Sequence, residues 1–371
     1  MRRTNSYAKH LWWIIPVLVA DYFLFSHLLR RGPALEGSLP AALQNVIPAA
    51  IVAPSPWKSL RFPTAQDRLL DPDPMGVFQP TASGNPESAL YGSVRTANNG
   101  SGLMSSFHEG IDIAAMQRDR AGRPLDDVMA VADGHVAYVN RIGGNSNYGI
   151  YVVLIHDDPA LGEVYTLYAH LARAEPDLRP GKTVRAGDVL GTMGNTASSG
   201  IPMARAHLHF EIGLINNMRF AAWYKANKLK PYHGNFHGRN FLGVNALDVF
   251  AHEQRTPDFD FLAHLETIPP AFELIARTSR TPDFFTRYPG LWEGSPVDHG
   301  VIVLKVSESG LPLRGRAATD TEMAELGRKS SLVLNVNEAV LGRNGCHLVS
   351  HAGGNWKLAS NGERWLEVLT Y

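Results

Sequence analysis

The sequence predicts a mainly β protein whose central part is an antiparallel β-sheet or sandwich-like domain. An N-terminal membrane segment is expected before it and a small C-terminal α+β domain after it. Three observations carry this prediction. A long apolar run follows basic residues at the N-terminus, short apolar runs alternate with glycine turns over residues 78–216, and the composition changes again after residue 216. Short runs rich in β-branched and aromatic residues, bounded by turn residues, are typical of strands.

The composition is that of a globular protein without a global charge. The 371 residues are 44% hydrophobic, and 35 Lys and Arg balance 35 Asp and Glu. A balanced charge gives no support for a nucleic-acid partner, and we expect none. The length allows two or three domains. Because Cys346 is the single cysteine, the chain can form neither an intrachain disulfide nor a cysteine-based zinc site.

Residues 1–31 predict a membrane anchor or a signal segment. Three basic residues stand before an apolar run from Leu11 to Leu29. As a helix this run spans about 28 Å, close to the thickness of a bilayer core. A signal peptide cleaved after Ala20 is the alternative, although Leu18 fits the small-residue rule poorly. In both cases we expect the rest of the chain to lie outside the cytoplasm, in the cell envelope.

Residues 32–77 predict a spacer because they are rich in alanine and proline. The strand signals begin after it. Individual strands are predicted by the segments VMAVADGHVAYVN, GIYVVLIHDD and EVYTLYAHL, and short strands between glycine turns by LRPGKTVRAGDVLGTMGNT. In the last segment, ARAHLHFEIG, side chains alternate between two faces. His207, His209 and Glu211 therefore share one face, and the apolar residues share the other.

Two more segments carry histidine. In FHEGIDIAA, His108 and Asp112 stand four residues apart, and the glycine and isoleucines between and beside them argue against a helix. An extended chain also places this pair on one face. In TLYAHLA, His170 is expected on the same strand face as Tyr168. Alone, the His108–Asp112 pair is explained about as well by a hydrogen-bonded pair at a turn, and the His207–His209 pair by a solvated strand face. His170 alone is better explained as a structural strand histidine than as a catalytic one.

Three such clusters in one predicted sheet favour a shared metal centre, and imidazole with carboxylate suits zinc.

The sequence motifs of other catalytic sites are absent or incomplete. The chain has no GxSxG, Walker or GxGxxG motif, and His108-Glu109 does not continue to HExxH because Asp112 takes the last position. Glu109 is expected to point away from the ligands. His233 and His237 have a metal-like spacing, but the glycine-rich sequence around them favours a loop.

Residues 217–284 predict a connecting region, and residues 285–371 a small C-terminal domain of unknown role. The segment from Asp260 to Arg277 predicts a helix interrupted near Pro269. Within the C-terminal domain, DTEMAELG predicts a helix. Strands are predicted by HGVIVLKV, SSLVLNVN, GCHLVSH and RWLEVLTY.

An ordered set of segments resembles the lysostaphin-type (LytM-like) zinc metalloendopeptidases, which cut peptide cross-links of peptidoglycan: FHEGIDIAA, ADGHVAYVN, YGIYVVLIHDD, YTLYAHLA, VRAGDVLGTMGNT and AHLHFEI. The resemblance covers residues 78–216, which it implies to be the zinc endopeptidase domain. It implies His108, Asp112 and His209 as zinc ligands and His170 and His207 as the catalytic pair, without deciding which of the two is the base. Three protein ligands leave a fourth zinc position for water.

The resemblance implies a hydrolase that cleaves the peptide cross-links of bacterial peptidoglycan. The loop TASSGIPMARA before His207 is longer than usual in the family, which affects the expected substrate preference. One alternative is a non-catalytic envelope protein of the same fold that binds and activates another wall hydrolase. Another is an envelope scaffold in which zinc is structural. The presence of all five polar positions favours the enzyme.

Overall fold

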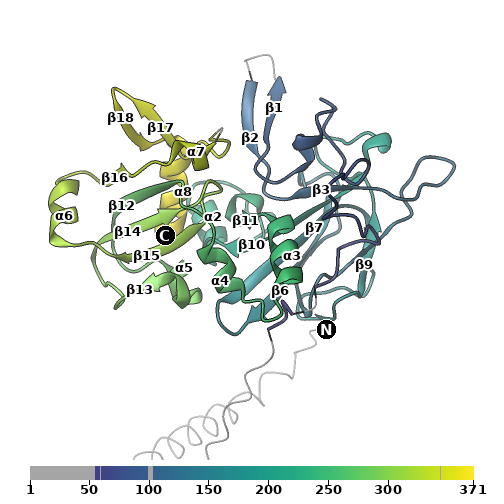
Figure 1. The fold of residues 1–371 in the computed structure, drawn as a ribbon, viewed down its shortest axis with the longest axis horizontal. Helices are drawn as coiled ribbons and strands as arrows, with labels where there is room; N and C mark the ends of the chain where they lie inside the picture. The colour runs from purple at the N-terminus through teal and green to yellow at the C-terminus, as the bar shows by residue number, and fades with distance from the viewer. Residues whose placement is uncertain (1–54, 59, 99–102, 343) are drawn as a thin grey trace, which may run out of the picture. The chain divides into compact units, whose positions relative to one another are not determined.

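The computed structural model describes residues 55–58, 60–98, 103–342 and 344–371 (Figure 1). The predicted membrane anchor or signal segment and the first part of the predicted spacer lie outside these residues. Among the helices of the described ranges, none combines the length and apolar character needed to span a bilayer.

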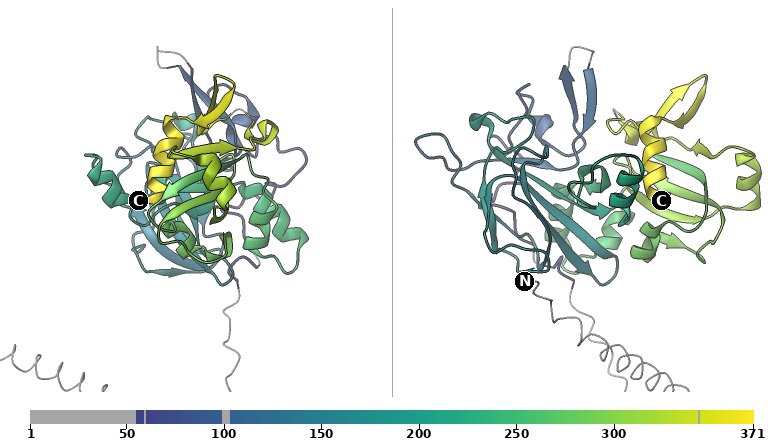
Figure 2. Two further views of the ribbon diagram at one scale, coloured as in Figure 1. Left: turned by 90° about the vertical axis from the view of Figure 1, so that its left-hand side faces the viewer. Right: turned by 180° about the vertical axis from the view of Figure 1, so that it is seen from behind.

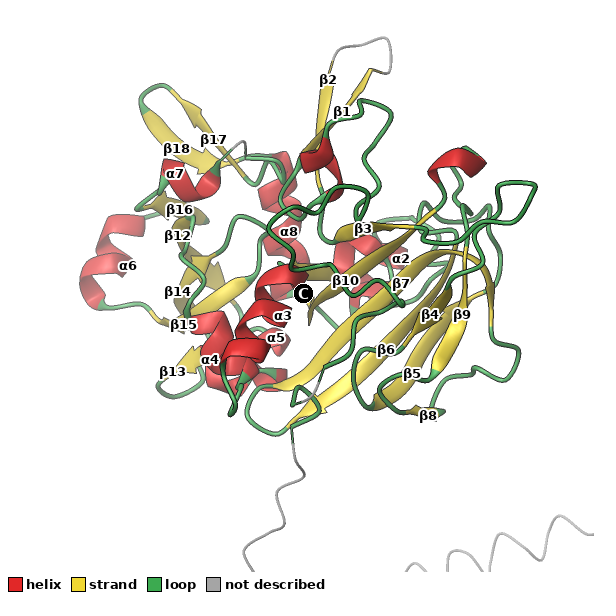
Figure 3. Cartoon of the chain, turned by 45° about the vertical axis from the view of Figure 1, so that its right-hand side comes forward, coloured by secondary structure: helices red, strands yellow, loops and turns green. Residues whose placement is uncertain are grey.

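The larger of two main sheets is antiparallel throughout (Figures 1 and 3). Its strand order is β11-β10-β7-β6-β5-β8, with β3 beside β10, β9 beside β7 and β4 beside β9. The prediction of a mainly β, antiparallel fold is confirmed. The strands are β3 (Ile111–Ala114), β4 (Asp127–Met129), β5 (Gly134–Asn140), β6 (Ile150–Asp158), β7 (Gly162–Ala174), β8 (Thr183–Val184), β9 (Val189–Met193), β10 (His207–Ile215) and β11 (Phe241–Val244).

Strand β10 is buried over its whole length, and its two faces have different characters. Its apolar side chains face the main hydrophobic core, where the ring of Phe210 lies 5.3 Å from that of Tyr168 on β7. His207, His209 and Glu211 alternate with them. The period of two that the sequence predicts therefore separates a core face from a polar face.

The prediction that His170 shares a strand face with Tyr168 is wrong. Tyr168 faces the main core, whereas His170 has a φ of 60° and lines a groove on the other side of the sheet. Between β6 and β7, Ile150 pairs with Leu171 and Val152 pairs with Tyr168, so β7 holds one extra residue. This β-bulge breaks the alternation and turns His170 away from the core.

A second sheet of five strands, in the order β13-β15-β14-β12-β16, lies beside the larger one, as the views from opposite sides agree (Figures 1 and 2). Two hairpins, β1-β2 and β17-β18, form separate two-stranded sheets, and β18 lies close to β16. The bounds are β1 (Val94–Asn98), β2 (Leu103–Phe107), β12 (Phe272–Thr278), β13 (Trp292–Glu293), β14 (Gly300–Val306), β15 (Pro312–Ala317), β16 (Ser331–Leu334), β17 (Val349–Ala352) and β18 (Asn355–Leu358).

The helices are short and occur mostly after β10. Helix α6 confirms the helix predicted from DTEMAELG, and a capping box between Thr319 and Glu322 begins it. The α-helices are α2 (Phe220–Ala226), α3 (Ala246–Arg255), α4 (Phe261–Glu266), α5 (Asp283–Arg287), α6 (Asp320–Leu326), α7 (Glu338–Leu341) and α8 (Ser360–Thr370). Single 3-10 turns are η1 (Pro86–Ala89), η2 (Met203–Arg205), η3 (Gly238–Asn240) and η4 (Pro289–Leu291).

Two predictions in this half of the chain are wrong. The helix expected over Asp260–Arg277 ends at Glu266, and the apolar residues after Pro270 form β12, which pairs on both sides with β14 and β16. The segment RWLEVLTY, expected as a strand, belongs to α8. Trp365, Val368 and Leu369 are spaced three and four residues apart, so a helix buries all three on one face.

Residues 55–77, which belong to the predicted spacer, lie against the larger sheet. The Trp57 side chain is fully buried, with its ring 4.8 Å from Phe261 of α4 and 5.1 Å from His156 of β6. The Ser55 hydroxyl donates to Asp158 at 2.8 Å. The sequence-based boundary at residue 77 is therefore later than the point where the chain begins to pack.

Contacts at the end of β10 join the larger sheet to the elements that follow. The Tyr288 hydroxyl accepts from the Ile215 amide at 3.1 Å, and Arg287 donates to the carbonyls of Ile215 and Asn216. The Asn217 side chain donates to the carbonyl of Val368 on α8 at 2.7 Å. These bonds fix the segment after β10, which borders the groove described next.

Candidate metal centre

Two paired strands and one turn bring the predicted ligands together. His108 directly follows β2, Asp112 lies on β3, and His209 lies on β10 opposite Asp112 in the antiparallel register. The turn between His108 and Asp112 passes directly over β10. A Cβ atom on Gly110 would lie 2.3 Å from the carbonyl oxygen of Phe210, so only glycine allows this approach.

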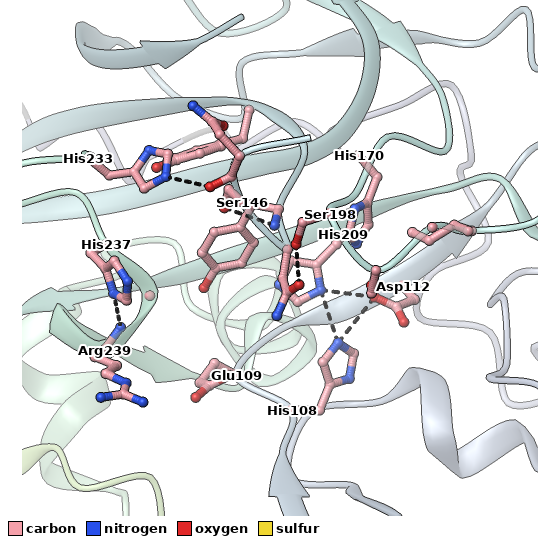
Figure 4. A pocket seen from close by; sticks show the side chains of 18 of the residues that line it. His108, Glu109, Asp112, Ser146, His170, Ser198, His209, His233, His237 and Arg239 are labelled. Atoms are coloured by element: carbon pink, nitrogen blue, oxygen red, sulfur yellow. Dashed lines mark hydrogen bonds and ion pairs between the residues drawn. The ribbon is translucent and has the colours of Figure 1, made fainter. Parts of the chain in front are cut away.

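The three side chains converge on one point (Figure 4). His108 Nε2 lies 3.1 Å from Asp112 Oδ1 and 3.0 Å from His209 Nδ1, and His209 Nδ1 lies 2.9 Å from Asp112 Oδ1. A tetrahedral zinc with bonds of about 2.0–2.2 Å separates its ligand atoms by about 3.3–3.6 Å. The set thus matches zinc in ligand chemistry and, with a small outward shift, in spacing. Each of the three residues is at most 5% exposed.

Hydrogen bonds behind the two histidines select the nitrogen that each presents. His108 Nδ1 lies 3.0 Å from the Leu90 carbonyl oxygen, and His209 Nε2 lies 2.7 Å from Glu211 Oε1. A carbonyl and a carboxylate only accept, so these nitrogens carry the protons. His108 Nε2 and His209 Nδ1 then point their lone pairs at the centre, as metal ligation requires.

Glu211 is a site residue to which the sequence analysis gave no role. Its side chain is fully buried and accepts from His209, from the Tyr148 hydroxyl at 2.7 Å and from the Tyr165 hydroxyl at 2.9 Å. Burial by itself would raise the pKa of Glu211, but the three donors lower it. The carboxylate therefore stays charged behind His209. Its place on the face of His207 and His209 was the available signal.

The ligand cluster combines a negatively charged carboxylate with a histidine that tends to be protonated. Burial would lower the pKa of His209, but its contacts with Asp112 and Glu211 raise it to about 9. Burial would raise the pKa of Asp112, but His108 and His207 hold it well below its usual range. A charged carboxylate among histidines is the electrostatic setting that attracts a divalent metal, which then displaces the imidazole proton.

His170 and His207 lie beside this centre, with their rings 4.8 Å apart. Nδ1 of His170 donates to the Thr196 carbonyl at 2.9 Å, and Nδ1 of His207 donates to the Arg205 carbonyl at 2.7 Å. His207 Nε2 lies 3.5 Å from Asp112 Oδ1 and has no hydrogen-bond partner among the described residues. Burial, and then His207 and His209, hold the pKa of His170 well below its usual range.

All five residues border a groove of about 910 Å³. Figure 4 shows His108, Asp112 and His209 on one side of it and His233, His237 and Arg239 on the other. The long loop before His207 and the segment after α2 supply much of its wall, including Ser198, Ser199, Lys230, Tyr232 and Gly238. The sequence analysis did not predict that residues after 216 border the site.

His233 and His237 do not form a second metal site. The two ring nitrogens of His233 are occupied by the Tyr138 hydroxyl and the Asn145 carbonyl, each at 3.1 Å. The His237 ring lies 6.3 Å from that of His233. Within the described ranges, the one group of three potential ligands is His108, Asp112 and His209. Glu109, expected to point away from this group, is half-buried and borders the groove.

Comparison with known proteins assigns this region to a family. Residues 106–220 match the sequence model of Peptidase family M23, so the chain contains an M23 domain, and the resemblance inferred from the sequence is confirmed at this level. The match covers His108 and the strands from β3 to β10, and therefore all three potential metal ligands.

Several solved structures are similar to parts of the chain. One is a zinc-containing peptidase from Vibrio cholerae (20% identity, 36% of this chain and 35% of that chain, TM-score 0.25). Another is the catalytic domain of lysostaphin from Staphylococcus simulans (25% identity, 33% and 76%, TM-score 0.24). A third is a variant of the catalytic domain of the prophage-encoded M23 protein EnpA from Enterococcus faecalis (24% identity, 37% and 86%, TM-score 0.23). The chain spans about a third of the length of the Vibrio protein.

Proposed function

We propose that the M23 domain of this chain is a zinc-dependent endopeptidase that hydrolyses peptide cross-links of bacterial peptidoglycan. His108, Asp112 and His209 would hold the zinc ion. His170 and His207 would act on the reacting groups. The family match supports a peptidase, and the groove beside the histidines has room for a peptide chain.

The observation that carries the proposal is the orientation of four imidazoles. Each one donates from one ring nitrogen to an acceptor at the outer side and keeps its other nitrogen for the centre of the groove. Four histidines with purely structural roles rarely all point one free nitrogen at the same place. A metal site with two acid-base groups requires this orientation. The four pairs are His108 with Leu90, His170 with Thr196, His207 with Arg205 and His209 with Glu211.

The chemistry divides between the metal and the chain. Bound zinc supplies a Lewis acid. His170, which burial keeps uncharged at neutral pH, presents an unprotonated Nε2 that can take a proton. His207, at the other side of the pair, presents its own Nε2 next to Asp112. Together they are placed to remove the proton of the attacking water, stabilise the tetrahedral oxyanion and protonate the leaving amine.

The cell envelope, outside the cytoplasm, is the compartment in which this substrate occurs. The basic residues and apolar run of residues 1–31 support a membrane anchor or an exported protein. N-terminal sequencing of the protein from the membrane fraction tests this part. A retained anchor gives the original N-terminus, and a mature chain that begins at Asp21 shows cleavage.

One experiment tests the activity and its residues. The purified full chain is analysed for zinc and incubated with purified peptidoglycan, beside Asp112→Ala and the matched control Asp127→Ala, whose carboxylate is exposed. We expect one zinc per chain and cleavage in wild type and control, and neither in Asp112→Ala. Stoichiometric zinc in Asp112→Ala would contradict the ligand assignment. Zinc without cleavage in the wild type would favour a non-catalytic wall-binding protein.

A further inference from the structure

The groove wall on the far side of the candidate metal centre comes from outside the M23 match. Residues 227–240 follow α2, and Lys230, Tyr232 and Arg239 of this segment border the groove. Figure 4 shows Arg239 at the end of the groove away from His108. Under the proposed function, a peptide that is cleaved at the candidate metal centre and lies along the groove would contact this wall beyond the scissile bond.

This wall is fixed to the sheet. Asn240 is fully buried, and its amide donates to the carbonyls of Asn217 at 2.9 Å and Asn235 at 2.8 Å. The buried His233 contacts the Asn145 carbonyl at 3.1 Å. These bonds hold the segment at His233 beside the loop between β5 and β6, and at Asn240 beside the end of β10.

The wall also packs close to the candidate centre. A Cβ atom on Gly238 would lie 3.1 Å from the Tyr148 hydroxyl oxygen, so glycine allows η3 to lie directly on that ring. Tyr148 donates to Glu211, which contacts His209. The side chains of Tyr148 and Glu211 therefore connect η3, the turn that contains Arg239, with His209.

The wall carries two cations, Lys230 and Arg239, and the carboxylate of Glu109 borders the same groove. Lys230 and Arg239 are exposed, and neither makes an ion pair with a described carboxylate, unlike Arg287, Arg314 and Arg316. Burial, followed by His233 and Arg239, lowers the pKa of His237 to about 4, so this histidine adds no charge at neutral pH. The whole chain has a formal net charge of zero, so these two cations do not reflect a generally basic chain.

We propose that Lys230 and Arg239 bind a carboxylate of the substrate peptide, so that the groove selects acidic peptide cross-links. The guanidinium fork of arginine matches a carboxylate, and Lys230, which borders the same groove, adds a second cation. This inference rests on the proposed function, since it names the substrate class of the same groove. The groove recognises this group by its negative charge. The carboxylate can therefore belong to any acidic side chain or to a free C-terminus.

The expected preference is moderate because both cations are exposed. An exposed ion pair contributes at most about 1 kcal/mol, which is about fivefold in affinity. Two cations together predict a preference of about 5- to 30-fold for a peptide with carboxylates over one with carboxamides.

The test uses soluble cross-linked peptides from peptidoglycan, freed of glycan, in two forms. One form is native, and in the other the carboxylates are converted to carboxamides. For the zinc-loaded full chain, kcat/KM is measured on both forms. Binding of fluorescently labelled peptides is measured separately, with the metal chelated so that no turnover occurs.

We expect the wild type to prefer the native peptides in both measurements. In the double variant Lys230→Gln/Arg239→Gln the preference should fall below about twofold, because cleavage of the native form falls toward that of the amidated form. The variant Arg239→Lys keeps the positive charge and should therefore retain most of the preference for the native peptides. The matched control Lys225→Gln/Arg120→Gln alters exposed cations away from the groove and should behave as wild type.

The outcomes separate this inference from the proposed activity. Equal cleavage of both forms by the wild type overturns the carboxylate site and leaves the activity standing. A preference that persists in the double variant also overturns it. If no form is cleaved but the chelated protein still binds native peptides through Lys230 and Arg239, the activity fails and the carboxylate site is supported. Absence of both cleavage and binding overturns both.

Discussion

The substitution Glu211→Gln tests the hydrogen bond that orients the candidate metal ligand His209, and it hardly changes the shape of the side chain. The carboxylate accepts three hydrogen bonds, from His209 Nε2, Tyr148 and Tyr165. A carboxamide has one accepting oxygen and one donating nitrogen. If the amide nitrogen faces His209, it favours the tautomer that carries its proton on Nδ1, which is the nitrogen that the metal needs. If it faces a tyrosine, the charge behind His209 is still lost.

Two independent arguments give the size of the effect. A charged acceptor makes a hydrogen bond worth about 1.5–3 kcal/mol, against about 0.5–1.5 kcal/mol for a neutral one, so the change costs about 1–1.5 kcal/mol. Loss of the orienting partner of a metal-bound histidine typically costs about 10- to 100-fold in metal affinity, or about 1.4–2.7 kcal/mol. The first argument predicts that zinc affinity falls by about 5- to 13-fold and the second by about 10- to 100-fold, so both include a loss of about tenfold.

The pH of the measurement matters because protons compete for the same nitrogen. With its pKa raised to about 9, metal-free His209 of the wild type is protonated at neutral pH and must lose that proton to bind zinc. Removal of the Glu211 charge lowers this pKa and so weakens the competition. The deficit of Glu211→Gln should therefore be largest above pH 9 and become smaller toward pH 7.

Competition with a chromophoric chelator measures the zinc affinity of wild type and Glu211→Gln at pH 9.5 and pH 7. Tyr165→Phe is the matched control, since it removes one donor to Glu211 and leaves the contact with His209. We expect this control to lose less than about threefold. Equal zinc affinity of Glu211→Gln and wild type at pH 9.5, with unchanged circular dichroism, would refute the reasoning.

Three further predictions concern other parts of the molecule. His207→Ala and His170→Ala should each retain zinc while cleavage slows by about 10²- to 10⁴-fold, and a zinc-free variant or a near wild-type rate would show that the residue has another role. Trp57→Ala should lower the free energy of unfolding in urea by about 3–5 kcal/mol because its side chain is fully buried, whereas a loss below about 1 kcal/mol would mean that residues 55–77 do not stabilise the sheet. Burial lowers the pKa of His156 to about 4, so its contribution is complete above pH 6.5 and is lost as the pH falls toward 4. Between pH 7 and 5 the wild type should lose about 2 kcal/mol more stability than His156→Gln, and parallel curves would contradict this.

The strands and the convergence of the predicted ligands could be predicted because their signals are local. Alternation with a period of two separates the faces of β10, and glycine turns mark the ends of β5 to β9. His108, Asp112 and His209 then meet because β3 pairs with β10, which requires only the close passage of Gly110.

The place of His170 could not be predicted in this way. The alternation of TLYAHLA directs it to the core, and an extra residue in β7 turns it to the groove. This bulge is held by the Tyr148 carbonyl, which accepts from the His170 amide at 2.9 Å, and by the Thr196 carbonyl. Both carbonyls belong to loops that are distant in sequence. The segment TLYAHLA alone therefore does not predict where His170 points.

The same limit applies after residue 216, where tertiary packing decides between helix and strand. RWLEVLTY contains apolar residues that suit either structure, and the contact of Val368 with Phe220 and Trp223 of α2 favours the helix. Lys230 and Arg239 border the groove because Asn217 and Asn240 hold a loop against the end of β10. A basic, turn-rich composition indicates an exposed loop but not the surface on which the loop lies.

Glu211 shows why the face of a residue is easier to predict than its role. The sequence places it beside His209, yet a lone buried carboxylate would be neutral and a poor orienting partner. It stays charged because Tyr148 and Tyr165, 63 and 46 residues away in sequence, supply hydroxyl donors. Those tyrosines are themselves placed by the loop before β6 and by β7, the strand next to β10. The charge behind His209 is thus a property of three separate segments, and it exists only once the sheet has formed.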